Sequence, residues 1–188
     1  MNILQTILPG CYELQPNIFR DIRGSFVKVF HEEIFNNYKL ETNFTEEYYS
    51  VSHQKVLRGM HFQTPPYEHT KLVYCPLGKV MDVVVDLRIG SPSYGKFAKF
   101  DLSAEKANII YIPPGLAHGF YVLSEMAILI YKVTTVYNSE HDSGILWNSV
   151  EIPWLDRQPI ISTRDSEFVS FADFVSPFQY REEVQHGC

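Results

Sequence analysis

The sequence has few cysteines and no long apolar run, and both scarcities exclude classes of protein. Its three cysteines, Cys11, Cys75 and Cys188, lie far apart and form no Cys-x-x-Cys pair. A disulfide framework and a structural zinc site are therefore not expected, and a reducing cytoplasm fits this cysteine usage best. No stretch approaches the ~20 apolar residues of a membrane span, and the N-terminus lacks the basic region and cleavage site of a signal peptide. We expect a soluble, cytoplasmic protein with no membrane partner.

Positive charge is also scarce. The chain has 16 Lys and Arg against 22 Asp and Glu, a net charge of −6. This balance argues against a nucleic-acid partner. It does not exclude a small anionic substrate, because a few local cations can override a weak overall field. With 188 residues, the chain is long enough for one well-buried domain and short for two.

Short strands separated by Pro and Gly turns dominate the pattern. Only two stretches look helical, at residues 31–38 and 165–173. Strands at roughly ten-residue spacing are typical of an all-β sandwich or barrel. We expect one domain over residues 1–180 and a charged, fraying tail at 181–188. The expected strands are 25–30, 45–52, 71–75, 79–87, 96–102, 108–112, 119–122 and 127–136.

The segment 57–71 places one proton-transfer residue between two cations. Arg58 and Lys71 flank His61 in a stretch that is otherwise apolar or turn-forming. Imidazole titrates near neutral pH, and fixed positive charge stabilises a developing anion. The pattern suits abstraction of a proton from carbon on a phosphate-bearing substrate.

A second motif surrounds His118. Residues 113–120, Pro-Pro-Gly-Leu-Ala-His-Gly-Phe, resemble the second cupin motif, whose His often binds a metal together with a His-x-His pair and a Glu. Here the matching stretch at 61–63 reads His-Phe-Gln, so one of those ligands is missing, although Glu68 and His69 follow. A metal needs three or four convergent donors. We predict no metal, and His118 as a hydrogen-bonded histidine that touches the substrate.

Several motifs occur in one order and together resemble the dTDP-4-dehydrorhamnose 3,5-epimerase family of nucleotide-sugar epimerases. The resemblance covers about residues 5–175. It implies a cupin-type jelly-roll β-barrel or sandwich with a few short helices, no cofactor, and a homodimer whose subunits share each active site. The motifs lie at residues 19–26, 56–63, 71–73, 83–88, 90–95, 112–120, 131–137 and 161–165.

The resemblance also implies catalytic roles. Epimerisation beside a 4-keto group needs a base, an acid on the opposite face and a cation for the enolate. His61 matches the base, Asp165 its carboxylate partner, Tyr131 the acid and Lys71 the cation. On their own, Asp165 could equally be a helix N-cap and Tyr131 a barrel-lining aromatic.

Further residues match the family's substrate contacts. Arg23 and Arg58 match diphosphate clamps, since guanidinium groups bind phosphate bidentately. In the family, Arg23 and Phe26 reach the neighbouring subunit's site. Without the resemblance, Arg23 would read as a turn arginine. Gly59 permits close approach of the backbone. The other expected substrate-binding residues are Lys28, Glu46, Tyr48, Gln63, His118 and Tyr137.

Three positions depart from the family pattern. Lys28 stands where the family commonly has Glu, and Glu46 and Tyr48 replace the amides of a Gln-x-Asn-x-Ser run that ends here at Ser50. The exchange of charge between 28 and 46 either preserves an ion pair or changes the base or sugar that is bound.

The function that we predict is cofactor-independent inversion of carbon 3, carbon 5 or both in a nucleoside-diphosphate-4-keto-6-deoxyhexose, for deoxysugar and polysaccharide synthesis. The alternatives are a single-carbon epimerase on another nucleotide sugar, a 3,4-ketoisomerase, a metal-dependent cupin enzyme using His61, His118 and Glu68 or His69, and a non-catalytic binding module. The sequence leaves the nucleobase, the sugar and the number of inverted carbons open.

Overall fold

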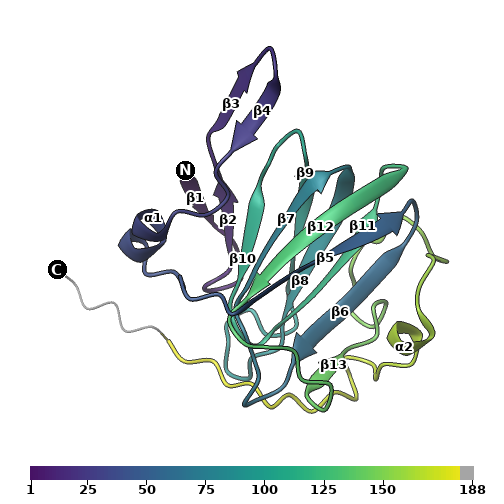
Figure 1. Ribbon diagram of the computed structural model, residues 1–188. Coiled ribbons are helices and arrows are strands. Elements are labelled where there is room, and N and C mark those ends of the chain that lie inside the picture. The colour runs from purple at the N-terminus through teal and green to yellow at the C-terminus, as the bar shows by residue number, and fades with distance from the viewer. Residues whose placement is uncertain (183–188) are drawn as a thin grey trace.

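The computed structural model describes residues 1–182, which form thirteen strands and two short helices (Figure 1). The helices are α1 (Glu32–Asn37) and α2 (Thr163–Ser166). The strands are β1 (Asn2–Gln5), β2 (Tyr12–Gln15), β3 (Ile18–Asp21), β4 (Gly24–Val27), β5 (Glu46–His53), β6 (Leu57–Gln63), β7 (Lys71–Leu77), β8 (Lys79–Asp86), β9 (Phe97–Ser103), β10 (Ile109–Ile112), β11 (Leu116–Val122), β12 (Met126–Val133) and β13 (Asp142–Gly144).

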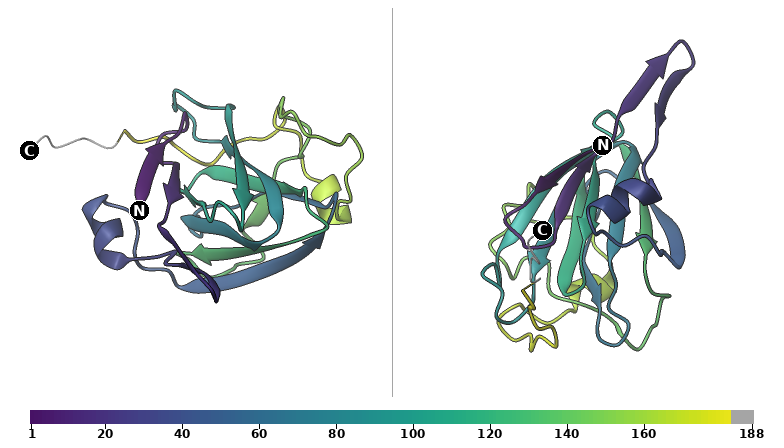
Figure 2. Two further views of the ribbon diagram at one scale, coloured as in Figure 1. Left: turned by 90° about the horizontal axis from the view of Figure 1, so that it is seen from above. Right: turned by 90° about the vertical axis from the view of Figure 1, so that its left-hand side faces the viewer.

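Two antiparallel sheets face each other and form a sandwich (Figures 1 and 2). One sheet has six strands in the order β1-β2-β10-β7-β12-β5, and the other has five in the order β13-β6-β11-β8-β9. Consecutive strands such as β7 and β8 lie in different sheets, so the chain crosses between the sheets repeatedly. The predicted all-β jelly-roll sandwich with few helices is confirmed.

Strand alternation creates three apolar layers. On β8, Val80 and Val84 point between the sheets, where they share a core with residues of the six-stranded sheet such as Leu129. Val83 and Val85, which alternate with these residues along β8, point to the outer face of the sheet. There they pack under the segment that follows β13. Apolar residues on both faces explain the Val-rich text of this strand, since a strand covered on both sides needs no polar face. The third layer lies on the outer face of the six-stranded sheet, where α1 inserts Phe35.

An irregular pairing in β6 determines which side chains face the space between the sheets. His118 of β11 pairs with His61, and Phe120 pairs with Arg58. Only Gly119 separates the two on β11, whereas two residues separate their partners, so β6 carries one extra residue. Residues three apart in a regular strand point to opposite faces. The extra residue, a β-bulge, restores Arg58 and His61 to the same face.

The bulge needs two glycines that face each other. Gly59 has a φ of +143°, and a Cβ atom there would lie 2.6 Å from the Cα of Gly119. This confirms the prediction that Gly59 permits a close approach of the backbone.

The hairpin of β3 and β4 projects beyond the sheets (Figure 1, and Figure 2, right). Its tip and flanks carry large apolar side chains that are exposed, including Phe19, Ile22 and Phe26. Exposed apolar groups gathered on a projecting element mark a surface that is suited to contact with another molecule.

Some expected elements differ from the structure. The helix expected at 165–173 is wrong: α2 ends at Ser166, and the residues after it are turns and coil. The strand expected at 71–75 ends later, because β7 continues to Leu77. Strands β1, β2, β3 and β13 are too short and mixed in polarity to stand out in the sequence. The strand expected at 119–122 begins earlier, at Leu116.

The described part of the chain ends outside the strands. Arg181 and Glu182 have no regular secondary structure, and residues 183–188 of the expected tail lie outside the described residues. The division into a domain at 1–180 and a tail stays a prediction. None of the helices in the described part is long and apolar enough to cross a membrane.

We expect Gly119→Ala to destabilise the fold. Its Cβ atom would lie 2.6 Å from the sulfur of Met60 and 2.8 Å from the carbonyl oxygen of Arg58. Overpacking of this kind costs about 1–3 kcal/mol. Urea unfolding of the variant should show that loss, and an unchanged midpoint would contradict the tight β6–β11 approach.

Candidate active site

A cavity of about 420 Å³ opens between the two sheets. It collects most of the residues that the sequence predicts for the site, from strands of both sheets. The predicted residues that line it are Glu46, Tyr48, Arg58, His61, Gln63, Lys71, His118, Tyr131 and Tyr137.

His61 and Asp165 form a hydrogen-bonded pair on one side of the cavity. The Nε2 atom of His61 lies 2.8 Å from Oδ1 of Asp165, and the two side chains are 28% and 5% exposed. Asp165 lies in the single turn of α2. The N-cap of this helix is Ser162, whose hydroxyl accepts a hydrogen bond from the backbone N–H of Asp165. The reading of Asp165 as the N-cap is therefore wrong.

The carboxylate of Asp165 stays ionised. Burial alone would raise its pKa, but hydrogen bonds from His61 and from the backbone N–H of Gly59 outweigh burial and lower the pKa below its usual value. An ionised carboxylate can only accept, so His61 donates through Nε2. The Nδ1 atom is then the ring nitrogen left with a lone pair to take a proton.

Lys71 supplies a buried positive charge on the opposite sheet. Its side chain is buried, and Nζ donates to the carbonyl oxygen of His61 over 3.1 Å. Burial lowers the pKa of Lys71 to about 8, while the nearby carboxylates Asp142 and Asp82 oppose that shift. The ammonium is thus charged at neutral pH and poorly solvated, which strengthens its attraction for an anion in the cavity.

Tyr131 projects from β12 of the six-stranded sheet. Its hydroxyl lies 3.3 Å from the hydroxyl of Ser50. Burial raises the pKa of Tyr131 far above its ordinary value, so the phenol keeps its proton at neutral pH. Tyr131 also belongs to the core between the sheets, so the sequence interpretation of a barrel-lining aromatic describes it as well.

Two further charged residues line the cavity and were missed in the sequence. Arg164 pairs with Asp142 over 2.8 Å. Arg164 directly precedes the predicted Asp165, and that adjacency was the signal available. Arg58, whose Nε donates to Ser52 over 2.9 Å, and Arg164 line this cavity together with Lys71, so three of its lining residues carry positive charge.

His118 has a partner that the sequence did not reveal. Its Nε2 lies 2.7 Å from Oδ2 of Asp82, and both side chains are buried. Burial raises the pKa of Asp82 despite the opposing effects of His118 and Lys71. Asp82 sits in a Val-rich strand, where alternation gives the only hint that it faces inward. The prediction of a hydrogen-bonded His118 is confirmed.

Polar residues form the remaining wall. Glu46 accepts the backbone N–H of Tyr137 over 2.7 Å, and Gln63 accepts that of Asn138 over 2.7 Å. Burial lowers the pKa of His69 to about 3, so its imidazole is neutral at neutral pH.

Glu46 is paired with the backbone amide of Tyr137. Within residues 1–182, no ion pair joins it to Lys28.

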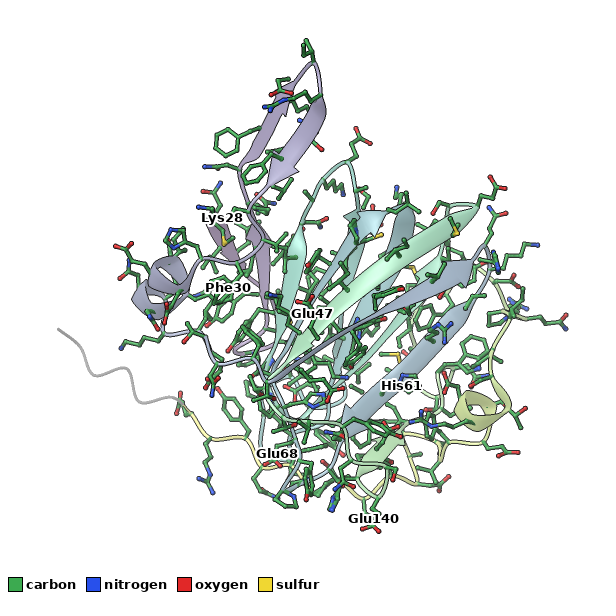
Figure 3. The ribbon with its side chains drawn as sticks, viewed as in Figure 1. Lys28, Phe30, Glu47, His61, Glu68 and Glu140 are labelled. Atoms are coloured by element: carbon green, nitrogen blue, oxygen red, sulfur yellow. The ribbon has the colours of Figure 1, made fainter. Side chains whose placement is uncertain are left out.

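Three predicted residues lie away from this cavity. Arg23 and Phe26 lie in the β3–β4 hairpin, and Lys28 follows it at the hairpin's base, well apart from His61 (Figure 3). Arg23 is paired with Asp21 in its own hairpin, yet its side chain is 86% exposed. Their assignment to substrate stays a prediction.

His61, His69 and His118 all line the cavity, but in the described part of the chain they and Glu68 do not form a group that could hold a metal ion. Glu68 lies apart from His61 (Figure 3), and His61 and His118 each face a different carboxylate. Within residues 1–182 there is no group of three or more His, Cys, Asp or Glu side chains that could hold a metal ion.

The arrangement is suited to moving protons through a molecule held between the sheets. His61 comes from the five-stranded sheet and Tyr131 from the six-stranded sheet, so a ligand between them would meet a base on one face and an acid on the other. The cations around it suit a substrate that is anionic or becomes so.

Comparison with known proteins gives consistent matches. The family model described as dTDP-4-dehydrorhamnose 3,5-epimerase matches residues 5–173. A dTDP-4-dehydrorhamnose 3,5-epimerase of Shigella flexneri is 39% identical over 176 residues, which are 92% of this chain and 97% of that protein.

Solved structures agree. The 3,5-epimerase RmlC of Legionella pneumophila in complex with dTDP-4-keto-L-rhamnose superposes with a TM-score of 0.90 at 33% identity, covering 96% of this chain and 98% of that one. ChmJ of Streptomyces bikiniensis, a 3'-monoepimerase in complex with dTDP-quinovose, reaches a TM-score of 0.84 at 28% identity, with coverages of 90% and 87%.

Proposed function

This chain belongs to the dTDP-4-dehydrorhamnose 3,5-epimerase family, and from that membership we propose that it is an isomerase acting on a nucleoside-diphosphate-4-keto-6-deoxyhexose. It inverts carbon 3, carbon 5 or both by removing and returning protons. One observation supports this function best: His61, which is paired with the ionised Asp165, lines one cavity together with Lys71 and Tyr131 of the facing sheet.

The proposed reaction begins at His61. Its Nδ1 atom takes the proton from a carbon beside the carbonyl, and the electron pair moves onto the carbonyl oxygen to give an enolate. Lys71 stabilises the new negative charge. Tyr131 then donates its proton to the same carbon from the other face, which inverts it. Solvent reprotonates the phenolate and takes the proton from His61, so both groups return to their starting states.

For substrate binding we propose Arg58 at the diphosphate, and Glu46, Tyr48, Gln63, His118 and Tyr137 at the sugar and base. Arg164 and Asp142 join this set because they line the same cavity. A 3,4-ketoisomerase would use similar groups but relocate the carbonyl, so NMR analysis of the product separates the two reactions.

We also propose a homodimer in which the β3–β4 hairpin reaches the partner's cavity. The hairpin projects beyond the sheets (Figure 1), and Phe26 is 63% exposed in the isolated subunit. Arg23, Phe26 and Lys28 would then contact the substrate of the other subunit. An arginine supplied in this way can bind diphosphate bidentately. We also propose a cytoplasmic location, which the free thiols of Cys11 and Cys75 support.

The reaction predicts exchange with solvent. Wild-type protein in deuterium oxide should incorporate deuterium into dTDP-4-keto-6-deoxyglucose at carbons beside the carbonyl, as followed by NMR. His61→Ala removes the base, so its exchange should fall at least about 10²-fold. Unchanged deuterium exchange in the variant would refute the role of His61. Absence of exchange in wild type, whichever nucleoside diphosphate carries the 4-keto sugar, would refute the function.

The lowered pKa of Lys71 should determine how the turnover rate falls at alkaline pH. Its pKa is lowered to about 8, so the charged form predominates below that pH and is lost as pH rises through it. The turnover rate of wild type should therefore fall above about pH 8. In Lys71→Arg the guanidinium stays charged, so the residual rate should not fall there. A parallel fall in both proteins would assign this pH dependence to another group.

Subunit mixing tests the shared site. Arg23→Ala should bind substrate roughly 10-fold or more weakly through loss of a phosphate contact, and His61→Ala should be inactive. In random mixed dimers, a cavity with His61 intact can receive an intact hairpin from its partner. At a substrate concentration far below the KM, Arg23→Ala alone should retain about a tenth of wild-type activity or less, and the mixture should then show about a quarter of wild-type activity. If Arg23 serves its own subunit, each cavity of a mixed dimer lacks one residue, and no activity returns.

A further inference from the structure

The ring of Tyr131 has an aromatic neighbour that the proposed reaction does not use. Tyr48 of β5 is the direct cross-strand partner of Tyr131 in β12. Side chains of directly opposed residues lie on one face of the sheet, close enough to pack. The two rings are stacked, with centroids 4.9 Å apart and planes 18° apart.

The stack is one of three contacts that restrain Tyr131. The hydroxyl of Ser50, two residues along β5 from Tyr48, lies 3.3 Å from the phenol oxygen. The ring of His118 from the opposite sheet meets Tyr131 edge-on at 6.1 Å. Tyr48 covers one face of the ring, Ser50 holds its hydroxyl, and His118 faces its edge. The phenol has one well-defined direction into the cavity.

Tyr48 is also a departure from the family's usual sequence. It stands where the resemblance leads one to expect a small amide, whereas Ser50 follows the pattern. Because β5 is an edge strand with β12 as its partner in the sheet, Tyr48 shields a face of Tyr131 that a small residue would leave open to solvent.

We propose that Tyr48 is a positioning residue that holds Tyr131 in the orientation needed to return a proton from the face opposite His61. This inference rests on the proposed epimerase function. In addition to its proposed contact with the substrate, Tyr48 acts through Tyr131 on the return of the proton, and it does not itself remove the first proton.

The enolate can be protonated by either of two residues. If Tyr131 donates, the carbon is inverted and product forms. If the protonated His61 returns its proton first, the original substrate is regenerated, and it carries deuterium once His61 has exchanged with solvent. A less well placed Tyr131 slows inversion but leaves abstraction unchanged, so more of the label returns to the substrate.

The experiment measures this partition in deuterium oxide. With dTDP-4-keto-6-deoxyglucose as the probe, NMR gives the ratio of deuterium in recovered substrate to deuterium in inverted product at early times. Tyr48→Ala should raise this ratio by roughly fivefold or more, the effect expected from losing an aromatic pair. Tyr48→Phe retains the ring and should keep the wild-type ratio. Tyr131→Phe should show the limit, with label in substrate and little product.

A matched control is Tyr94→Ala. Tyr94 is 40% exposed against 41% for Tyr48, and it packs on Phe171 away from the cavity. Its loss should leave the ratio unchanged. Both labelled species are made by the same active molecules, so a smaller folded fraction of the variant does not alter their ratio. A wild-type ratio in Tyr48→Ala would overturn the inference while leaving the epimerase intact, whereas no label in wild type would refute the proposed function itself.

Discussion

The site depends on one irregular pairing, in which an extra residue in β6 lies opposite Gly119 of β11. Regular alternation would send Arg58 and His61 to opposite faces of the sheet. The bulge brings both into the space between the sheets and sets His61 beside His118, its partner in register. It requires backbones so close that neither Gly59 nor Gly119 could carry a side chain without displacement. The positions of the proposed base His61 and of the proposed diphosphate contact Arg58 therefore follow from packing between two glycines.

Burial then sets the charge of each group. Asp165 keeps its charge because His61 and the N–H of Gly59 donate to it, and this leaves His61 oriented to accept a proton. Lys71 stays charged at neutral pH although burial weakens its hold on the proton, whereas burial keeps the Tyr131 phenol protonated. The groups proposed as base, cation and acid are thus in the states that the proposed proton removal and return require, and the proposed base and acid lie on different sheets.

The sequence predicted the fold class well, because turn residues and β-branched runs report strands directly. It also indicated most of the cavity through ordered motifs around His61, Lys71 and Tyr131. It did not reveal the partner of His118, because Asp82 lies in a strand that is buried on both faces, where alternation gives the only hint that Asp82 faces inward. Nor could it foresee that Tyr48 stacks on Tyr131, since register between β5 and β12 joins residues far apart in the chain. The short helix around Asp165 was overextended because the apolar residues after it pack as irregular chain.

The proposed reaction requires that His61 and Tyr131 act on opposite faces of one sugar. A crystal structure of the protein with dTDP-4-keto-6-deoxyglucose, or with a reduced analogue, would show this arrangement. We expect a carbon beside the carbonyl to lie between Nδ1 of His61 and the Tyr131 oxygen, each about 3–3.5 Å away and on opposite faces of the ring. A sugar ring that presents the same face to both residues, or that lies outside the space between the sheets, would contradict it.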